Sequence, residues 1–222
     1  MKQPAPPQLP VLIKNDFFIE DEAHFEANRF TNSDHSYLTG KNIIIRQSEL
    51  EKITLHKTRL DNFEASNVIF RNCDFSNIEW LKASFHQVIF EQCKLTGANF
   101  AESYLRDCQF HDCLCDFVSF SQGNLKVVTF ANCRLTDSEF YNLKWQHINF
   151  INNDLTGSNW GHTSLNKLDF SNNKFYRIIL EQENLRGLIV NSQQALVQLV
   201  WGLLLKISLF NPAPHSQKHP NR

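Results

Sequence analysis

An apolar residue, in nearly every case a large one, stands at every fifth position of this chain from Leu50 to Val190. This interval matches neither the 3.6-residue period of an α-helix nor the two-residue period of a β-strand. Of the 29 positions in this series, 12 are Phe, 11 are Leu and 3 are Trp. The series never changes register, so no insertion interrupts it. The pattern indicates that one short structural unit is repeated along most of the chain.

A second series lies two positions before the first and holds small or β-branched residues, such as Val68, Cys73 and Ile78. At one unit the two series exchange sizes, because Phe63 stands two residues before Ala65. Such an exchange roughly conserves the volume of the pair. We infer that both series point into one common interior.

Two stretches of the repeat, "CKLTGANF" (residues 93–100) and "NDLTGSNW" (residues 153–160), resemble the consensus of the pentapeptide-repeat family, in which a small and a polar residue precede Leu or Phe and two polar residues follow. The resemblance covers about residues 41–190. It implies an all-β solenoid, namely a right-handed quadrilateral β-helix with 20 residues per coil, followed here by a short C-terminal α-helix. Four units then form one coil, and residue n lies beneath residue n+20.

Columns of identical residues at 20-residue intervals fit such a coil. One consists of Phe70, Phe90, Phe110, Phe130, Phe150 and Phe170, and another of Cys73, Cys93, Cys113 and Cys133. Rings one coil apart, at about 4.8 Å, are at a suitable distance to stack. We therefore predict a shaft with a filled interior and no ligand cavity.

The six cysteines all fall on inward positions of this coil, where a thiol acts as a compact apolar group. A disulfide between adjacent coils is the alternative, since such coils lie close together. Zinc is disfavoured because a straight column of thiols does not supply tetrahedral ligands, and the sequence has no Cys-x-x-Cys pair. We expect no metal and no cofactor.

Four segments are predicted from the composition along the chain. They are a flexible proline-rich N-terminal segment (1–24), the pentapeptide-repeat β-helix (25–190), a capping and dimerisation helix (191–210) and a disordered tail (211–222). The prolines of the first 18 residues interrupt any apolar run of the length that a signal peptide needs, so we expect a cytoplasmic protein.

The C-terminal helix is expected to start after a cap at Asn191 or Ser192. It is apolar around most of its circumference, so it needs a second surface besides the last coil. Members of the family resembled here commonly dimerise through such a helix, and we predict a homodimer. The predicted interface consists of Leu196, Val200, Trp201, Leu203, Leu204 and Ile207. A membrane span is the competing interpretation, but the run of about 16 residues is shorter than the roughly 20 required.

An enzyme is disfavoured because catalysis needs groups that converge in a cleft, whereas the polar residues of this repeat fall on a convex wall. An active site at one end of the rod is the remaining alternative. We predict a protein without catalytic residues that acts as a macromolecular binding module through its outer surface.

The resemblance includes the quinolone-resistance branch of the family, whose members imitate duplex DNA and engage DNA gyrase or topoisomerase IV. That imitation needs an acidic surface. Residues 41–190, however, contain nearly equal numbers of acidic (17) and basic (16) residues. In the outward column from Asp74 to Lys174, the charge mostly alternates in sign. A general protein-interaction scaffold is the alternative function, and direct nucleic-acid binding is not expected.

Two sets of outward residues are candidates for contact with a partner. The acidic set consists of Glu91, Glu102, Asp107, Asp112 and Asp116. The apolar set consists of Ile69, Ile89, Tyr104, Leu114, Phe117, Val127, Tyr141, Ile151 and Tyr176. The acidic set would suit a partner with a basic surface. The apolar set would indicate a binding site only if its members form a contiguous patch.

Overall fold

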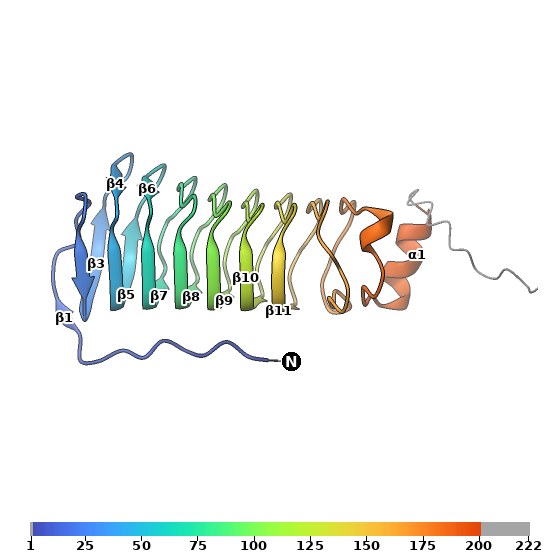
Figure 1. Ribbon diagram of the computed structural model, residues 1–222, viewed down its shortest axis with the longest axis horizontal. Helices are drawn as coiled ribbons and strands as arrows, with labels where there is room; N and C mark the ends of the chain where they lie inside the picture. Colours follow the sequence, from blue (N-terminus) through green and yellow to red (C-terminus); the bar gives the residue numbers. More distant parts are fainter. Residues whose placement is uncertain (1, 201–222) are drawn as a thin grey trace, which may run out of the picture.

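The chain forms a parallel β-solenoid in a computed structural model that describes residues 2–200 (Figure 1). In chain order its strands are β1 (Ile13–Lys14), β2 (His24–Glu26), β3 (Asn28–Asp34), β4 (Thr39–Lys41), β5 (Ile44–Thr54), β6 (Arg59–Asp61), β7 (Glu64–Arg71), β8 (Ser84–Glu91), β9 (Tyr104–His111), β10 (Asn124–Ala131) and β11 (Lys144–Ile151). A short 3₁₀ turn η1 (Gln182–Asn184) and the helix α1 (Ser192–Val200) follow.

The strands stack in two sheets. A nine-stranded sheet has the order β1-β3-β5-β7-β8-β9-β10-β11, with β2 beside β5, and a two-stranded sheet joins β4 to β6. Isolated parallel bridges continue the stacking on the sides that lack named strands, for example between Glu139 and Asn159. The result is a rod of stacked coils, as Figure 1 shows.

The predicted 20-residue register is confirmed along the shaft. Phe70 pairs with Phe90, and Phe90 with Phe110, in consecutive strands. The rings of Phe90 and Phe110 lie with their centroids 4.7 Å apart and their planes 6° from parallel. Each ring therefore rests on the ring of the neighbouring coil, which adds aromatic stacking to the burial of apolar area.

The passage from one five-residue step to the next uses left-handed backbone two residues after the large inward residue. Asn62, Asn67 and Asn72 have φ of 55°, 56° and 52° there. Asn tolerates this conformation better than most residues, and Gly tolerates it freely. Gly157, with φ of 74°, is required also by space, because a Cβ atom on it would lie 2.1 Å from Oδ1 of Asp137.

The interior is filled by the two inward series, and its largest members, such as Trp80 and Trp160, are fully buried. Several polar members of the small series donate a hydrogen bond to the carbonyl 23 residues earlier, which pairs their donors inside the shaft. Examples are Cys73 Sγ to the Leu50 carbonyl (3.4 Å), Ser103 Oγ to the Trp80 carbonyl (2.7 Å) and Asn153 Nδ2 to the Phe130 carbonyl (3.0 Å).

Helix α1 covers the C-terminal end of the shaft. Asn191 caps it, because its Oδ1 accepts the backbone N–H of Gln194 at 2.9 Å while Gln194 Oε1 accepts the N–H of Asn191 at 2.8 Å. Gln194 Nε2 also donates to the carbonyls of Phe170 and Asn173 at 2.9 and 2.6 Å. These bonds fix the start of the helix on the end of the shaft.

At the other end, the sequence suggested a flexible segment over residues 1–24, and the structure places strand β1 and an extended arm there. Strand β1 pairs with β3, and Phe17 is buried against Phe25 and Phe30 with ring centroids 5.3 Å from each. Residues 2–12 then run back along the outside of the shaft, toward the end that carries β11 (Figure 1). Backbone groups of this arm form hydrogen bonds with the wall, which composition alone does not reveal.

Candidate binding surface

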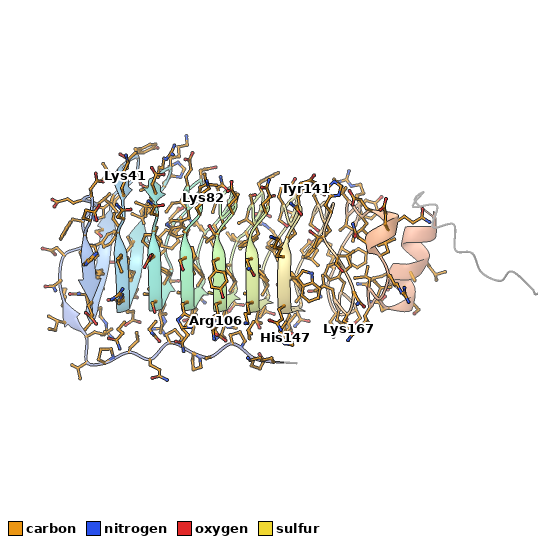
Figure 2. All side chains as sticks on the ribbon, viewed as in Figure 1. Lys41, Lys82, Arg106, Tyr141, His147 and Lys167 are labelled. Carbon is orange, nitrogen blue, oxygen red and sulfur yellow. The ribbon has the colours of Figure 1, made fainter. Side chains whose placement is uncertain are left out.

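The outer wall is the surface on which a function has to be sought, because the inward side chains fill the shaft. Figure 2 shows labelled side chains along two opposite long edges, with Lys41, Lys82 and Tyr141 on one and Arg106 and His147 on the other. Such a wall offers polar contacts along its whole length.

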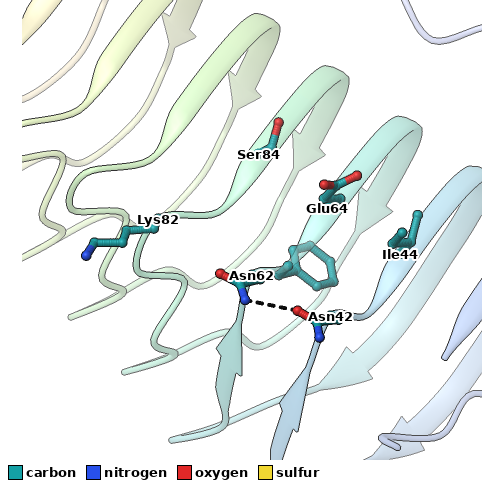
Figure 3. Close-up of a pocket in the computed structure, with 7 residues that line it drawn as sticks. Asn42, Ile44, Asn62, Glu64, Lys82 and Ser84 are labelled. Carbon is teal, nitrogen blue, oxygen red and sulfur yellow. Dashed lines mark hydrogen bonds between the residues drawn. The ribbon is translucent and has the colours of Figure 1, made fainter. Parts of the chain in front are cut away.

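The hollow drawn in Figure 3 is an example of the depressions on this wall. It has a volume of about 300 Å³ and is open to solvent. Two of its lining residues are bonded to each other, since Asn62 Nδ2 donates to Asn42 Oδ1 at 2.9 Å. Asn42 Nδ2 in turn donates to Oε1 of Glu22, outside the lining, at 2.6 Å. Lys82 extends away from Glu64 in this view and lies 3.5 Å from Glu102. The amide side chains that line this hollow thus belong to a ladder of hydrogen bonds that joins successive coils.

Two of the predicted acidic residues face a cation one coil earlier. Glu91 Oε2 lies 2.7 Å from Arg71 Nε, and Glu102 Oε2 lies 3.5 Å from Lys82 Nζ. The same arginine also contacts Glu49, a buried carboxylate that Arg29 holds from the other side at 2.8 Å. The sequence analysis did not predict this network of ion pairs. Opposite charges spaced by 20 or 22 residues in the sequence would have indicated it.

The other three predicted acids differ in exposure. Asp107 has 13% of its side chain exposed and accepts the backbone N–H of Ala5 at 3.2 Å. Asp116 has 7% exposed, and Arg134 Nε donates to both of its oxygens at 2.7 Å. Asp112 is exposed and accepts Asn132 Nδ2 at 3.1 Å.

The five predicted acids do not form one acidic face. Residues share a face column only when their numbers differ by 20, and no two of these five do. Opposite charges also neighbour each other along the column that starts at Asp74, as the alternation predicted: Lys94 lies 3.4 Å from Asp74, and Lys174 lies 2.6 Å from Asp154. The wall therefore neutralises much of its own charge.

The members of the predicted apolar set also differ widely in exposure. Phe117 is 61% exposed, and Leu114 and Tyr104 are each 38% exposed. Ile69 and Ile89 are half-buried, and Val127 is only 1% exposed although it occupies an outward position. Something on the outside of the shaft therefore covers Val127.

All six cysteines are buried free thiols. Burial raises the pKa of the Cys108 thiol to about 12 and holds that of Cys93 well above its ordinary value. A neutral buried thiol is a poor nucleophile and a poor metal ligand. Among residues 2–200, no group of three His, Cys, Asp or Glu side chains is arranged to hold a metal ion.

The predicted dimer interface is described only at its start. Leu196 on α1 is 63% exposed, and the backbone of Val200 ends the helix. Trp201, Leu203, Leu204 and Ile207 lie outside the described residues. Within residues 2–200, no helix has the length and apolar character needed to cross a membrane.

The coils stack into a solenoid, the backbone is left-handed once in most five-residue steps, and charges on the wall neutralise one another. These features define a repeat protein of the β-solenoid class. A family model described as "Pentapeptide repeat region" matches residues 83–160. The coils before and after this segment repeat the same five-residue step, so the shaft as a whole has the β-helix fold of pentapeptide-repeat proteins. A comparison with curated proteins found no match.

Solved structures give distant likenesses. A trypsin-treated form of QnrB1, described as a plasmid-mediated fluoroquinolone resistance protein, is 17% identical over 86% of this chain and 94% of its own, with a TM-score of 0.36. HetL from Nostoc sp. strain PCC 7120, a pentapeptide repeat protein involved in heterocyst differentiation regulation, is 13% identical over 72% of this chain and 86% of its own, with a TM-score of 0.23.

Proposed function

We propose that this protein is a non-enzymatic binding module that recognises another macromolecule through the outer wall of its solenoid. The observation that carries the proposal is the filled interior, in which the column from Phe70 to Phe170 is at most 6% exposed at every coil. With the interior occupied, polar and apolar groups for recognition remain only on the wall.

The sharper form of the proposal is a DNA mimic that binds a type II topoisomerase, DNA gyrase or topoisomerase IV, and protects it from quinolones. The straight rod and the sequence resemblance to the quinolone-resistance branch support it. The acidic candidates Glu91, Glu102 and Asp112 are those with side chains accessible to a basic groove.

The test is DNA supercoiling by gyrase in the presence of a fluoroquinolone, with increasing amounts of the purified protein. We expect supercoiling to recover. Glu102→Lys should weaken the recovery, while Glu64→Lys, the same charge change on an exposed strand residue outside the acidic set, should not. Supercoiling that stays inhibited at every protein concentration contradicts topoisomerase protection.

A general protein-interaction scaffold is the second candidate, and the ion pairs between coils favour it. Because Asp74 with Lys94 and Asp154 with Lys174 neutralise one another, the wall lacks the uniform charge of a DNA duplex. Purification of partners with the full chain as bait should then return a protein other than a topoisomerase.

We also propose that the protein is a cytoplasmic homodimer joined through its C-terminal helix. The exposed Leu196 supports the contact, and six unpaired thiols suit a reducing compartment. Light scattering should give twice the chain mass of 25.9 kDa. Leu196→Asp should reduce the mass to that of one chain, and a wild-type protein that is already monomeric contradicts the proposal.

A further inference from the structure

Val127 is an unusual residue at an unusual position. It faces outward and has left-handed backbone with φ of 57°, yet it is 1% exposed. Among the described non-glycine residues with positive φ it is the only β-branched one, and this conformation is unfavourable for such side chains. Phe117, half a coil earlier, has the same φ and is 61% exposed.

The N-terminal arm is bonded to the wall on both sides of Val127. Asn149 Nδ2 donates to the carbonyl of Lys2 at 3.3 Å, and the N–H of Ala5 donates to Asp107 Oδ1 at 3.2 Å. Between these two contacts the arm crosses the coil of Val127, and Pro4 is buried there.

The contacts continue toward the N-terminal end of the shaft. Gln87 Nε2 donates to the carbonyl of Pro6 at 3.3 Å, and the N–H of Gln8 donates to Asn67 Oδ1 at 3.0 Å. Asn67, Gln87, Asp107 and Val127 occupy the same position of successive coils. From Asp107 to Asn67 the arm therefore follows one outward column, and Figure 1 shows the arm lying alongside the rod.

The spacing of these contacts matches the period of a polyproline helix. Lys2, Ala5 and Gln8 are three residues apart. Asn67 and Asp107, the partners of Gln8 and Ala5, lie two coils apart, and Asn149, the partner of Lys2, lies two coils and two residues beyond Asp107. Three residues of polyproline II advance about 9.3 Å and return to the same face. Two coils advance about 9.6 Å. A β-strand does not return to the same face after three residues, so this register suits polyproline II in particular.

We propose that the column of Asn67, Gln87, Asp107 and Val127, together with the neighbouring Asn149, is a binding site for an extended proline-rich peptide, and that residues 2–10 of this chain are its resident ligand. Prolines stiffen the arm, side chains of the column bond the N–H groups between the prolines, and Val127 supplies the apolar contact. A partner with a similar segment has to displace the arm. This inference does not depend on the function proposed above.

Amide hydrogen exchange on the full chain tests the docking. The amides of Ala5 and Gln8 should exchange at least about tenfold more slowly than in an unstructured peptide, because each donates a hydrogen bond to the wall. Val127→Lys should remove this protection, and Phe117→Lys, its exposed counterpart, should retain it. Exchange at unstructured rates in the wild type, or equal behaviour of the two variants, overturns the proposal.

Binding of a labelled peptide with the sequence of residues 2–12, followed by fluorescence anisotropy, tests the site itself. The double variant Ala5→Pro with Gln8→Pro keeps the arm stiff but deletes both of its bonding N–H groups, so the site is more often vacant. It should bind the peptide about tenfold more tightly than the wild type, whose tethered arm competes. Val127→Lys added to it should abolish binding, as should Ser in place of the peptide's prolines. Absence of peptide binding to the double variant, or binding unaffected by Val127→Lys, overturns the proposal.

Discussion

The middle and the last coil of the rod are built from the same repeat but are buried to different degrees. In the middle, strands β8 to β10 have eight residues each, and the rings of Phe90 and Phe110 stack at 4.7 Å. Near the end, Phe150 and Phe170 lie 5.7 Å apart at 87°.

The inward residues of the last coil, residues 171–190, show the same trend. Phe175, Leu180 and Leu185 are only partly buried, and no named strand crosses this coil. The large series is intact there, so the difference does not come from the repeat itself. This last coil is thus less completely covered than the middle coils, and it is the place where unfolding should begin.

Thiol labelling should give the largest contrast between the two regions. The native cysteines lie in the interior of the middle coils, and a pKa of about 12 for Cys108 leaves about a thousandfold less thiolate than an ordinary thiol. They should stay unlabelled in the folded protein. The thiol introduced by Leu188→Cys, at an inward position of the last coil, should react quickly. Mass spectrometry measures both, and native cysteines that label as fast as the introduced thiol would remove the contrast.

Truncation of a core ring should cost more in the middle than at the end. Phe110→Ala is expected to lower the free energy of unfolding by about 3–5 kcal/mol, because neighbouring coils hold the cavity open. Phe175→Ala should cost less, since its ring is already partly exposed. Urea denaturation followed by circular dichroism provides the comparison. Equal losses at the two sites would show that the last coil is as well packed as the middle.

Removal of the helix cap should loosen the last coil alone. Asn191→Ala deletes the bond to the N–H of Gln194, and a lost cap typically costs about 1 kcal/mol. We expect faster hydrogen exchange over residues 171–190 and unchanged exchange in β8 to β10. Faster exchange in the middle strands would mean that the rod unfolds as one unit.

The ion pair of Asp154 and Lys174 should give the smallest effect, and it depends on pH. Burial raises the pKa of Asp154, but hydrogen bonds from Lys174 and Thr156 outweigh it, so the pKa is lowered overall. Because the folded pKa lies below the unfolded one, the pair stabilises the fold above about pH 4, and the contribution disappears as the pH falls through the folded value.

The magnitude of this effect should be at most about 1 kcal/mol, since the lysine is largely exposed. Asp154→Asn should lower the free energy of unfolding at pH 6 and make little difference at pH 3. Urea denaturation at the two pH values measures it, and a loss that is equal at both would exclude the charge as its cause.

The sequence predicted the parts of the fold that periodicity encodes. The 20-residue register and the inward position of the cysteines follow from side chains at regular intervals, and the structure has both. Capping chemistry placed the start of the helix at Asn191 or Ser192, and the structure has the cap at Asn191. The small series has a second role that the sequence analysis did not predict. Besides filling the interior, its thiols and hydroxyls donate hydrogen bonds to carbonyls 23 residues earlier.

The docking of the arm was not predictable in the same way. It depends on backbone N–H groups of Ala5 and Gln8, which every residue except proline possesses, so no side-chain pattern marks it. The acidic set failed as a single face for a related reason: a count of charges along the chain does not show that Asp107 lies under the arm or that Asp116 is held by Arg134.

The unbroken register also limits how the length of this rod can change. One residue added or removed inside a coil would turn every later inward side chain toward solvent, as a slip of register does in a β-sheet. Only whole coils of 20 residues keep the columns aligned. The rod therefore lengthens in steps of about 4.8 Å. For a molecule that binds it at two separate points, the distance between those points can change only by multiples of this step.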